Sequence, residues 1–552
     1  NLTSTIGIGH TRWATHGGVT VANAHPHLDC TGTIALIHNG IVENFQELKK
    51  ELLAKGHQFK SETDTEIIVH LLEENLKAAV TFTQAMQQTF NALSGLNAVV
   101  ALNSRTNEII AAKNGSPLLV GIGDTPGEYF LASDATGIIK HTKKVIFLED
   151  NQLVSLRGAV ATKQSQDDGR DRHAPSSLAM TLYSLPDGKE ITPHITTLDW
   201  DFTEAEKGTF PHFLLKEIHE QPKVIEHIAL TYQTQTKQLA ELIKKAYGTF
   251  MLGCGTASYA ALAGVYLFSH IAKKHVNFSI GSEFNYLEDY ITDRTLVIPI
   301  SQSGETIDVV EPVQKAKAKG ATIAALVNVL GSTIYRQADY KIVLGAGQEK
   351  AVVSTKAFMA MFSILLMTCY TLINKQKEAK DMLLAAGKDI KKVIAEKSVK
   401  EIKNVVNQLK KHEHIYLLGR GLSYVTALEA ALKIKETACI HAEGFAGGEL
   451  KHGVIALVEK GTPCIVMAPN DETYEEIISN AQEVKARGGL IIGIGPKNNP
   501  VFDHFLETAD NQEATLLSQV AISQLLSYYL ALARGIKDPD KPRNLAKSVT
   551  VK

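Results

Sequence analysis

The chain has 552 residues, of which 44% are hydrophobic and 21% charged, proportions typical of a globular protein with room for three or four domains. Lys plus Arg number 57 and Asp plus Glu number 59, and a net charge of −2 excludes the strongly basic classes, so we expect no nucleic-acid and no membrane-surface partner. The five cysteines lie far apart, which predicts reduced thiols in a cytoplasmic protein.

Residues 1–155 alternate short apolar runs with polar loops, a pattern typical of a layered α+β domain. The strands expected there cover 32–40, 96–104 and 128–134, and the helices cover 44–56 and 63–79. A linker over 156–212 follows and includes a polar loop at 163–178. Within the linker, Asp187-Gly188 lies between two short runs and predicts a hairpin.

The stretch HTRWATHG at 10–17 is a dense cluster of polar and aromatic residues. Histidines gather in this region, at His10, His16, His25, His27 and His38. A metal cluster is one interpretation, but no carboxylate or cysteine spacing supports it, so we expect no metal. In HNG, Asn39 and the Gly40 N–H could stabilise an oxyanion, although an ordinary Asn-Gly turn explains the same letters.

Residues 213–535 contain an internal repeat. FMLGCGTASYAAL and IYLLGRGLSYVTAL share an apolar strand, a Gly-x-Gly turn and a helix, with Gly253 and Gly419 166 positions apart. This repeated order of strand, loop, helix and strand predicts two α/β domains with parallel sheets. The two domains are expected at 213–385 and 386–535.

Two further segments are ambiguous from composition. AFMAMFSILLMTCYTLI, residues 357–373, is 17 residues long and contains Ser and Thr, whereas a membrane span needs about 20 mostly apolar residues. A helix buried inside a large domain is therefore expected. The last segment, PDKPRNLAKSVTVK at 539–552, has few apolar residues and two prolines, and by composition alone it predicts a frayed terminus.

The loop SQSGET, residues 301–306, follows an apolar strand and precedes a helix, so in a parallel sheet it lies at the carboxyl edge, where ligands bind. Its hydroxyls and the N–H groups of the helix start favour an anion such as a phosphate. No GxxxxGK[ST] pattern is present, which argues against a nucleotide. A Ser/Thr-rich helix cap is the alternative. With CGTAS (254–258) and VVSTK (352–356), three hydroxyl-rich loops fit a sugar phosphate.

The helix over 427–436 places Glu429, Lys433 and Glu436 on one face. A salt-bridge ladder explains this spacing. The next segment, 440–453, gathers histidines, glutamates and a lysine around four glycines. Acid–base chemistry on a sugar needs a carboxylate and an imidazole, and both are present, so a catalytic interpretation stands beside the ladder.

Taken in order, these motifs resemble one family. They are HTRWATHG, NAHPH, HNGIVEN, SETDTE, CGT, SQSGET, STKAF, LGRG, ALKIKE, GGELKHG and PRNLAKSVTV. From residue 5 to residue 552 they resemble the glutamine–fructose-6-phosphate aminotransferase (isomerizing) family, also called glucosamine-6-phosphate synthases.

The resemblance implies a glutaminase domain of the N-terminal-nucleophile class, an α+β sandwich, followed by two α/β sugar isomerase (SIS) domains and a catalytic tail at 536–552. It implies that glutamine is hydrolysed in one site and that ammonia passes through an internal channel to fructose 6-phosphate, yielding glucosamine 6-phosphate. It also implies a cytoplasmic homodimer that needs no metal or organic cofactor.

For the glutaminase site, the resemblance assigns Arg12 to the glutamine carboxylate and Asp64 to the amino group. It assigns the pocket lining to Thr15 and His16, the oxyanion hole to Asn39 and Gly40, and the ammonia gate to Trp13.

For the isomerase site, the resemblance assigns the phosphate to Ser301, Gln302, Ser303 and Thr306, and the lining of the sugar to Thr256, Val352 and Ser354. Lys547 would form a Schiff base with the open-chain ketose, which only a neutral amine can do. Glu436, assisted by Lys433, would move a proton between C1 and C2, and His452 would help to open the ring. An ordered tail is implied, contrary to its composition.

Two positions depart from the family pattern. Ala257 stands where the family often has a serine after CGT, and Ser258 follows it. The family's nucleophile is an N-terminal cysteine, whereas this chain starts with Asn1, so the simplest interpretation is an N-terminally truncated chain. Cys30 has no N-terminal amine, and we do not expect it to act as a substitute.

Two other functions fit parts of the sequence. With an inactive glutaminase, the chain would be an ammonia-dependent glucosamine-6-phosphate synthase or isomerase. A regulator that senses sugar phosphates would need a basic helix-turn-helix, which the sequence lacks, and would not need Glu436, His452 and Lys547. The two-site aminotransferase is therefore the main hypothesis.

Overall fold

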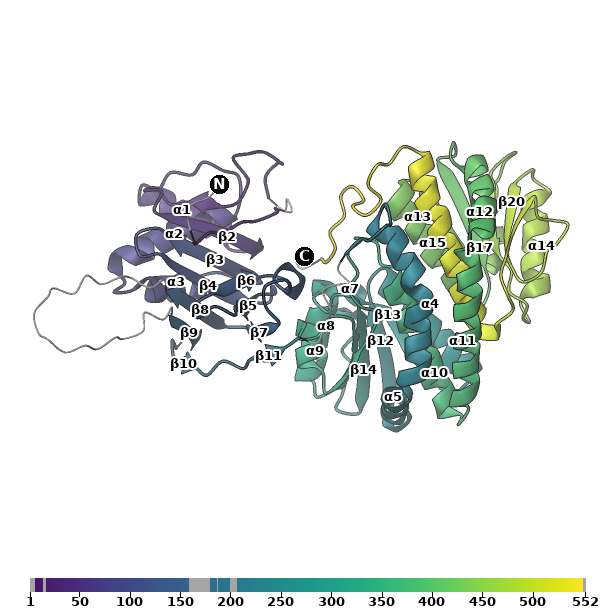
Figure 1. The fold of residues 1–552 in the computed structure, drawn as a ribbon, viewed down its shortest axis with the longest axis horizontal. Helices are drawn as coiled ribbons and strands as arrows, with labels where there is room; N and C mark the ends of the chain where they lie inside the picture. Colours follow the sequence, from purple (N-terminus) through teal and green to yellow (C-terminus); the bar gives the residue numbers. More distant parts are fainter. Residues whose placement is uncertain (1–4, 13–15, 158–178, 186, 199–205, 550–552) are drawn as a thin grey trace, which may run out of the picture. The chain divides into compact units, whose positions relative to one another are not determined.

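Figure 1 shows a computed structural model of the chain, which describes residues 5–12, 16–157, 179–185, 187–198 and 206–549. Trp13, Thr15 and the predicted polar loop at 163–178 lie outside these described residues. The chain divides into two compact units between residues 202 and 203, and each is described by itself.

The first unit contains two antiparallel sheets. The larger sheet has the order β1–β2–β3–β4–β8–β9–β10 and the smaller one β11–β7–β5–β6. The larger sheet consists of β1 (His27–Leu28), β2 (Ile34–Gly40), β3 (Asn97–Asn103), β4 (Glu108–Asn114), β8 (Gln152–Arg157), β9 (Ala179–Ser184) and β10 (Glu190–Ile191). The smaller consists of β5 (Leu119–Ile122), β6 (Tyr129–Ala132), β7 (Lys144–Phe147) and β11 (Thr196–Thr197). The helices are α1 (Phe45–Ala54), α2 (Thr65–Ala78) and α3 (Phe82–Asn91).

The larger sheet is the middle layer of this unit, because successive residues of a strand point to opposite faces. On β3, Val99 and Ala101 belong to the core that the helices cover. Their neighbours Ala98 and Val100 belong to the core shared with the smaller sheet. The predicted α+β sandwich is confirmed, and the five elements expected in this domain correspond to β2, β3, β6, α1 and α2.

The predicted hairpin at Asp187-Gly188 is confirmed, because β9 and β10 pair antiparallel around it. The predicted start of the linker at residue 156 needs correction. β8 continues to Arg157, β9 pairs with β8, and β11 pairs with β7. Two-residue strands such as β10 and β11 carry too little pattern to be read from sequence, so only the pairing shows that they belong to the first unit.

The second unit contains two five-stranded sheets in which all strand pairs are parallel. The first has the order β13–β12–β14–β15–β16 and the second β18–β17–β19–β20–β21. The strands are β12 (Gly248–Gly253), β13 (Asn277–Ile280), β14 (Thr295–Ser301), β15 (Thr322–Val327), β16 (Tyr340–Val343), β17 (His414–Gly419), β18 (His441–Ala446), β19 (Pro463–Met467), β20 (Leu490–Gly495) and β21 (His504–Glu507).

Helices cover both faces of each parallel sheet, as in other α/β folds, with α8 and α9 on one side of the first sheet and α14 on one side of the second (Figure 1). The helices of the first half are α4 (Phe213–Thr231), α5 (Gln233–Lys245), α6 (Thr256–His270), α7 (Gly281–Phe284), α8 (Ile307–Ala318), α9 (Thr333–Gln337), α10 (Lys356–Leu372) and α11 (Gln376–Val393). Those of the second half are α12 (Glu396–Leu409), α13 (Leu422–Ala438), the 3-10 helix η3 (Gly447–His452), α14 (Tyr474–Lys485) and α15 (Thr515–Ala533).

The predicted repeat is confirmed down to its backbone angles. Gly255 precedes α6 with φ 54 and ψ −129, and Gly421 precedes α13 with φ 53 and ψ −130. These positive φ values favour glycine. A Cβ at Gly253 would lie 2.6 Å from the Ala257 carbonyl carbon, and one at Gly419 would lie 2.1 Å from the Ser423 oxygen. Each Gly-x-Gly therefore lets a strand turn tightly into its helix.

The expected buried helix at 357–373 is α10, in which every residue from Lys356 to Tyr370 is buried. Among the described residues, one helical stretch, Gln512–Ala533, is long and apolar enough to cross a membrane. It contains α15, and 83% of its apolar window is buried inside the second unit, as in the core helix of a globular domain.

The frayed terminus expected from composition is wrong for residues 539–549, the described part of that segment. The Asp540 carboxylate accepts the backbone N–H groups of Phe213 at 2.8 Å and Leu214 at 2.7 Å, at the start of α4. The Asp540 carbonyl accepts the Val352 N–H at 2.9 Å. Hydrogen bonds to distant loops, which composition does not report, hold this tail in place.

We predict that Gly253→Ala destabilises the second unit by about 1–3 kcal/mol, because the new methyl would overlap the backbone of α6. Gly248→Ala, on the same strand, is the matched control, since its Cβ would meet the Phe250 ring at an ordinary 3.6 Å. Urea unfolding followed by circular dichroism measures both variants. Equal midpoints would contradict the tight turn.

Candidate functional site

The SQSGET loop lies at the carboxyl end of β14, where Ser301 ends the strand and Thr306 precedes α8. The Ser301 hydroxyl accepts the Gly304 N–H at 2.9 Å, and the Ser303 hydroxyl accepts the Glu305 N–H at 3.1 Å. Both hydroxyls lie within 3.5 Å of the Thr306 hydroxyl. The loop thus gathers hydroxyl groups at a helix N-terminus, a favourable position for an anion.

The C-terminal tail lies directly on this loop. The Ser548 hydroxyl donates to the Ser303 hydroxyl at 3.0 Å. The Val549 carbonyl accepts the Ile307 N–H at 3.0 Å, and so satisfies one of the free N–H groups at the start of α8. These contacts bring Lys547 close to the SQSGET loop, although 246 positions separate Lys547 from Ser301 in the sequence.

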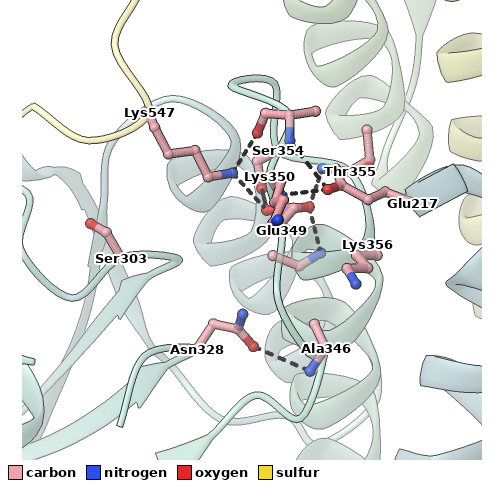
Figure 2. A network of polar contacts seen from close by, with 12 residues as sticks. Glu217, Ser303, Asn328, Ala346, Glu349, Lys350, Ser354, Thr355, Lys356 and Lys547 are labelled. Carbon is pink, nitrogen blue, oxygen red and sulfur yellow. Dashed lines mark hydrogen bonds and ion pairs between the residues drawn. The ribbon is translucent and has the colours of Figure 1, made fainter. Parts of the chain in front are cut away.

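Figure 2 shows where the Lys547 amine points. It donates to the Ala351 carbonyl at 2.6 Å and lies 3.5 Å from the Glu349 carboxylate. Glu349 is fully buried and accepts the Thr355 N–H at 2.7 Å and the Ser354 hydroxyl at 3.2 Å. Burial alone would raise the pKa of Glu349, but the Lys547 ammonium and the Thr355 N–H outweigh it and lower that pKa below its ordinary value.

Glu217, on α4, is a second buried carboxyl beside this network (Figure 2). One of its oxygens accepts the Lys350 N–H at 2.5 Å and the Ala351 N–H at 3.2 Å. The other has no partner among the described residues. Burial, reinforced by the negative charge of Glu349, raises the pKa of Glu217 to about 8. At neutral pH, therefore, Glu217 is mostly protonated and Glu349 carries the charge.

The salt bridges expected from the spacing of Glu429, Lys433 and Glu436 are present, and they form a largely buried cluster. The Lys433 amine lies 2.5 Å from Glu436 and 3.5 Å from Glu429, and it donates to the Thr256 hydroxyl at 2.9 Å. The side chains of Glu429 and Lys433 are 0% and 1% exposed because α13 packs against α6 and α15. The Glu436 side chain is 20% exposed and lies at the accessible end of the cluster.

The charges of this cluster are coupled. Burial, reinforced by Glu436, raises the pKa of Glu429 to about 8 although Lys433 opposes it. Burial would lower the pKa of Lys433, but Glu429 and Glu436 outweigh burial and raise it. Glu349 also contributes to that raised pKa. One buried carboxylate therefore acts electrostatically on both amines, Lys433 and Lys547.

Some predicted residues take other positions. His452 is exposed at the end of η3, and within the described residues no hydrogen bond or ion pair joins it to Lys433 or Lys547. The Ser258 hydroxyl donates to the Gly255 carbonyl at 2.7 Å, so it is engaged inside its own turn beside buried Ala257.

Gln302 and Val352 contribute backbone groups to the loops. The Gln302 carbonyl accepts the Asn328 N–H at 3.2 Å. The Val352 N–H is bound by the tail at Asp540, so this loop and the tail hold one another in place.

In the first unit, Arg12 and Asp64 shape the backbone around His16. The Arg12 guanidinium donates to the carbonyls of Gly18 at 2.9 Å and Gly17 at 3.1 Å, and also to that of His16. The buried Asp64 carboxylate accepts the Val42 N–H at 2.9 Å and lies 4.0 Å from the His16 ring. The two charged groups expected to bind glutamine therefore both neighbour His16.

Asn39 and Gly40 end β2, as expected for the proposed oxyanion hole. The side-chain amide oxygen of Asn39 faces the His10 ring, at 2.8 Å from Nε2. Gly40 has φ 138, and a Cβ there would lie 2.3 Å from the Leu96 carbonyl, so this position requires glycine.

Sequence reasoning missed Glu217 and Glu349. Glu349 follows a Gly-rich turn, GAGQE, and precedes the hydroxyl-rich VVSTK, which is a weak signal for a buried charge. Glu217 lies on an otherwise ordinary amphipathic helix. Glu217 becomes a buried acceptor only because the backbone at residues 350 and 351 packs against it.

Comparison with known proteins agrees with this architecture. The glutamine amidotransferase domain family matches residues 10–140, and the SIS domain family matches residues 241–370 and 408–534. The glutamine–fructose-6-phosphate aminotransferase [isomerizing] of Pyrococcus horikoshii is 40% identical, covering 100% of this chain and 90% of its own. That of Thermococcus kodakarensis is 41% identical, covering 99% and 89%.

The chain belongs to the glutamine–fructose-6-phosphate aminotransferase (isomerizing) family. Among solved structures, the C-terminal domain of the Francisella tularensis enzyme superposes with a TM-score of 0.55 at 32% identity, covering 60% of this chain and 98% of that domain. A glucosamine-6-phosphate deaminase from Thermotoga maritima superposes with a TM-score of 0.51 at 22% identity, covering 62% and 100%, and shares the fold.

We predict that stability falls as the pH rises from about 5 to about 8, because folded Glu217 and Glu429 retain protons that the unfolded chain has lost. Each such group contributes a slope of at most about 1.4 kcal/mol per pH unit. Glu217→Gln keeps the acceptor for the two N–H groups and removes the titration, so its urea midpoint should fall less over this range.

Glu226→Gln, at an exposed position of the same helix, is the control and should keep the wild-type dependence. A Glu217→Gln midpoint that fell as steeply as the wild type would contradict the protonated state of Glu217.

Proposed function

We propose that this aminotransferase transfers the amide nitrogen of L-glutamine to D-fructose 6-phosphate and isomerises the product to D-glucosamine 6-phosphate, releasing L-glutamate. This is the first step of amino-sugar synthesis toward UDP-N-acetylglucosamine. The observation that carries the proposal is the position of Lys547. The C-terminal tail lies on the SQSGET loop, which is suited to bind a phosphate, and so holds the Lys547 amine beside that loop.

The phosphate of the sugar would bind at the SQSGET loop. Ser301, Ser303 and Thr306 supply hydroxyls, Gln302 supplies an amide, and α8 supplies backbone N–H groups. Thr256, Val352 and Ser354 would line the sugar. The sugar would thus extend from the start of α8 toward the Lys547 amine.

Lys547 would form a Schiff base with the open-chain ketose. Its neutral amine adds to the C2 carbonyl, a C–N bond forms, and the carbonyl oxygen leaves as water. Ammonia then adds at C2 and displaces the lysine, which leaves the C2 imine of the sugar. Glu349, beside the amine, would compensate the charge of the ammonium form, which gives up its proton to solvent before the neutral amine adds.

Glu436 would then move one proton. It would take a proton from C1 and return it to C2, while the proton of the C1 hydroxyl moves to the imine nitrogen. The C2 imine thereby becomes an amine and C1 becomes an aldehyde, with no external oxidant. Lys433, 2.5 Å from the Glu436 carboxylate and fixed by Thr256, would orient that carboxylate and compensate its charge.

Glutamine would be hydrolysed in the first unit. Arg12 would bind its carboxylate and Asp64 its amino group, while Asn39 and the Gly40 N–H would stabilise the oxyanion. The pocket lining by Thr15 and His16 and the gating by Trp13 belong to the same proposal.

His452 would open the sugar ring only if a second copy of the chain presents it, because within one chain it is exposed on η3. We therefore propose a homodimer. We further propose that it works in the cytoplasm on its two small-molecule substrates, with no nucleic-acid or membrane partner.

The assay supplies ammonium as well as glutamine, so that the isomerase site is tested independently of the glutaminase site.

We predict that Lys547→Ala lowers ammonium-dependent glucosamine 6-phosphate formation at least about 1,000-fold, because the covalent step is lost. Lys541→Ala, at an exposed position of the same tail, is the control and should retain activity. Reduction with borohydride in the presence of fructose 6-phosphate should attach the sugar to the wild type and not to Lys547→Ala, as measured by mass spectrometry. Near-normal turnover of Lys547→Ala would remove the lysine from the mechanism.

We predict that a mixture of Lys547→Ala and His452→Ala chains, unfolded and refolded together, recovers activity that neither variant has alone. In a mixed dimer, one site would combine an intact Lys547 with an intact His452 from the neighbouring chain. Initial rates of product formation measure the recovery. Activity that stayed at the level of the separate variants would exclude a shared site.

A further inference from the structure

Four potential metal ligands converge in the first unit, outside the proposed glutamine pocket. Cys30 lies in the turn between β1 and β2, His57 follows α1, and His70 and Glu73 lie on one face of α2. One ligand atom from each lies within 4.8 Å of the other three.

The distances among these atoms match a tetrahedral zinc site. The Cys30 sulfur lies 3.6 Å from His57 Nδ1 and 3.5 Å from His70 Nδ1. The Glu73 Oε2 atom lies 3.2 Å from each of the same two nitrogens. With Zn–N near 2.0 Å and Zn–S near 2.3 Å, the edges of a tetrahedron are about 3.3–3.6 Å.

The outward-facing nitrogens both lie near carboxylates, as metal-bound histidines commonly do. His57 Nε2 lies 3.1 Å from Glu74, within hydrogen-bond distance, whereas His70 Nε2 lies 3.7 Å from Glu66, beyond that distance. A carboxylate partner that accepts the proton of Nε2 in a hydrogen bond leaves Nδ1 free to bind a metal. Both rings therefore turn their Nδ1 atoms to one common centre.

We propose that Cys30, His57, His70 and Glu73 bind one structural Zn²⁺ ion. Thiolate and imidazole ligands select zinc over magnesium or calcium. Four protein ligands leave no open position, which is the arrangement of structural zinc sites. On binding, the Cys30 thiol would release its proton to solvent, and Cys30 is exposed enough to let the ion enter.

The ion would fasten three segments that the fold brings together. The Cys30 N–H already donates to Glu73 at 3.0 Å, which docks the β1–β2 turn on α2. Asp64, the residue proposed to bind the amino group of glutamine, precedes the same helix, and six helical residues span roughly 9 Å. Zinc would therefore stabilise the helix that positions the glutamine site.

The test uses the 552-residue chain, stripped with chelator and then dialysed against ZnCl₂. We expect about one tightly held zinc per chain by plasma mass spectrometry. Cys30→Ser and His70→Asn should each lower zinc affinity at least about 10-fold. Cys439→Ser and His141→Asn, which change a cysteine and a histidine outside the cluster, should bind zinc as the wild type does.

Cobalt distinguishes the ligands. Co²⁺ in place of zinc should give the intense visible absorption of a tetrahedral site and a thiolate charge-transfer band that Cys30→Ser abolishes. Chelator should lower the melting temperature of the wild type and leave Cys30→Ser unchanged. Failure of the wild type to hold zinc, or equal zinc binding by Cys30→Ser and His70→Asn, would overturn the proposal in favour of a purely ionic cluster.

Discussion

The isomerase unit depends on the neutralisation of one buried carboxylate, Glu349. A fully buried charge is stable only when hydrogen bonds and opposite charges compensate for lost solvation. Here the compensation comes from the N–H groups and hydroxyl of the loop before α10 and from the Lys547 amine. Because Lys547 comes from the C-terminal tail, the charge of Glu349 helps to hold that tail across the sugar-phosphate loop.

The same constraint explains the paired carboxyls. Two neighbouring buried carboxyls cannot both ionise at low cost, so Glu217 stays mostly protonated while Glu349 is charged. In the second cluster, Glu429 is mostly protonated while Lys433 compensates Glu436. Each cluster thus keeps one charged carboxylate beside one amine, so that the two charges compensate one another in the interior.

The glutaminase unit holds its pocket in place in a different way. Its pocket residues come from loops and strand ends, and local hydrogen bonds such as the one from the Val42 N–H to Asp64 hold the described ones in place. The proposed zinc ion would add a rigid link between the β1–β2 turn, the residue after α1, and α2. The two units would then be stabilised by different chemistry, a buried ion pair in one and a metal in the other.

Much of the fold and part of the site could be predicted from sequence. The sequence predicted correctly those features that depend on interactions between residues close together in the chain. The Gly-x-Gly turns, the apolar runs and the 166-residue spacing predicted two parallel sheets, and the loop SQSGET predicted an anion site at a helix start.

Only the tertiary structure decided the rest. Whether Glu429, Lys433 and Glu436 lie on a surface or in a core depends on the helices that pack against α13. Whether the tail frays depends on hydrogen bonds to residues more than 180 positions away. The cysteine, two histidines and glutamate of the proposed zinc site come from three segments, so their spacing along the chain carries no metal pattern. The burial of a side chain, and the meeting of side chains from distant segments, depend on how the whole chain packs. The periodicity of the sequence does not report either of them.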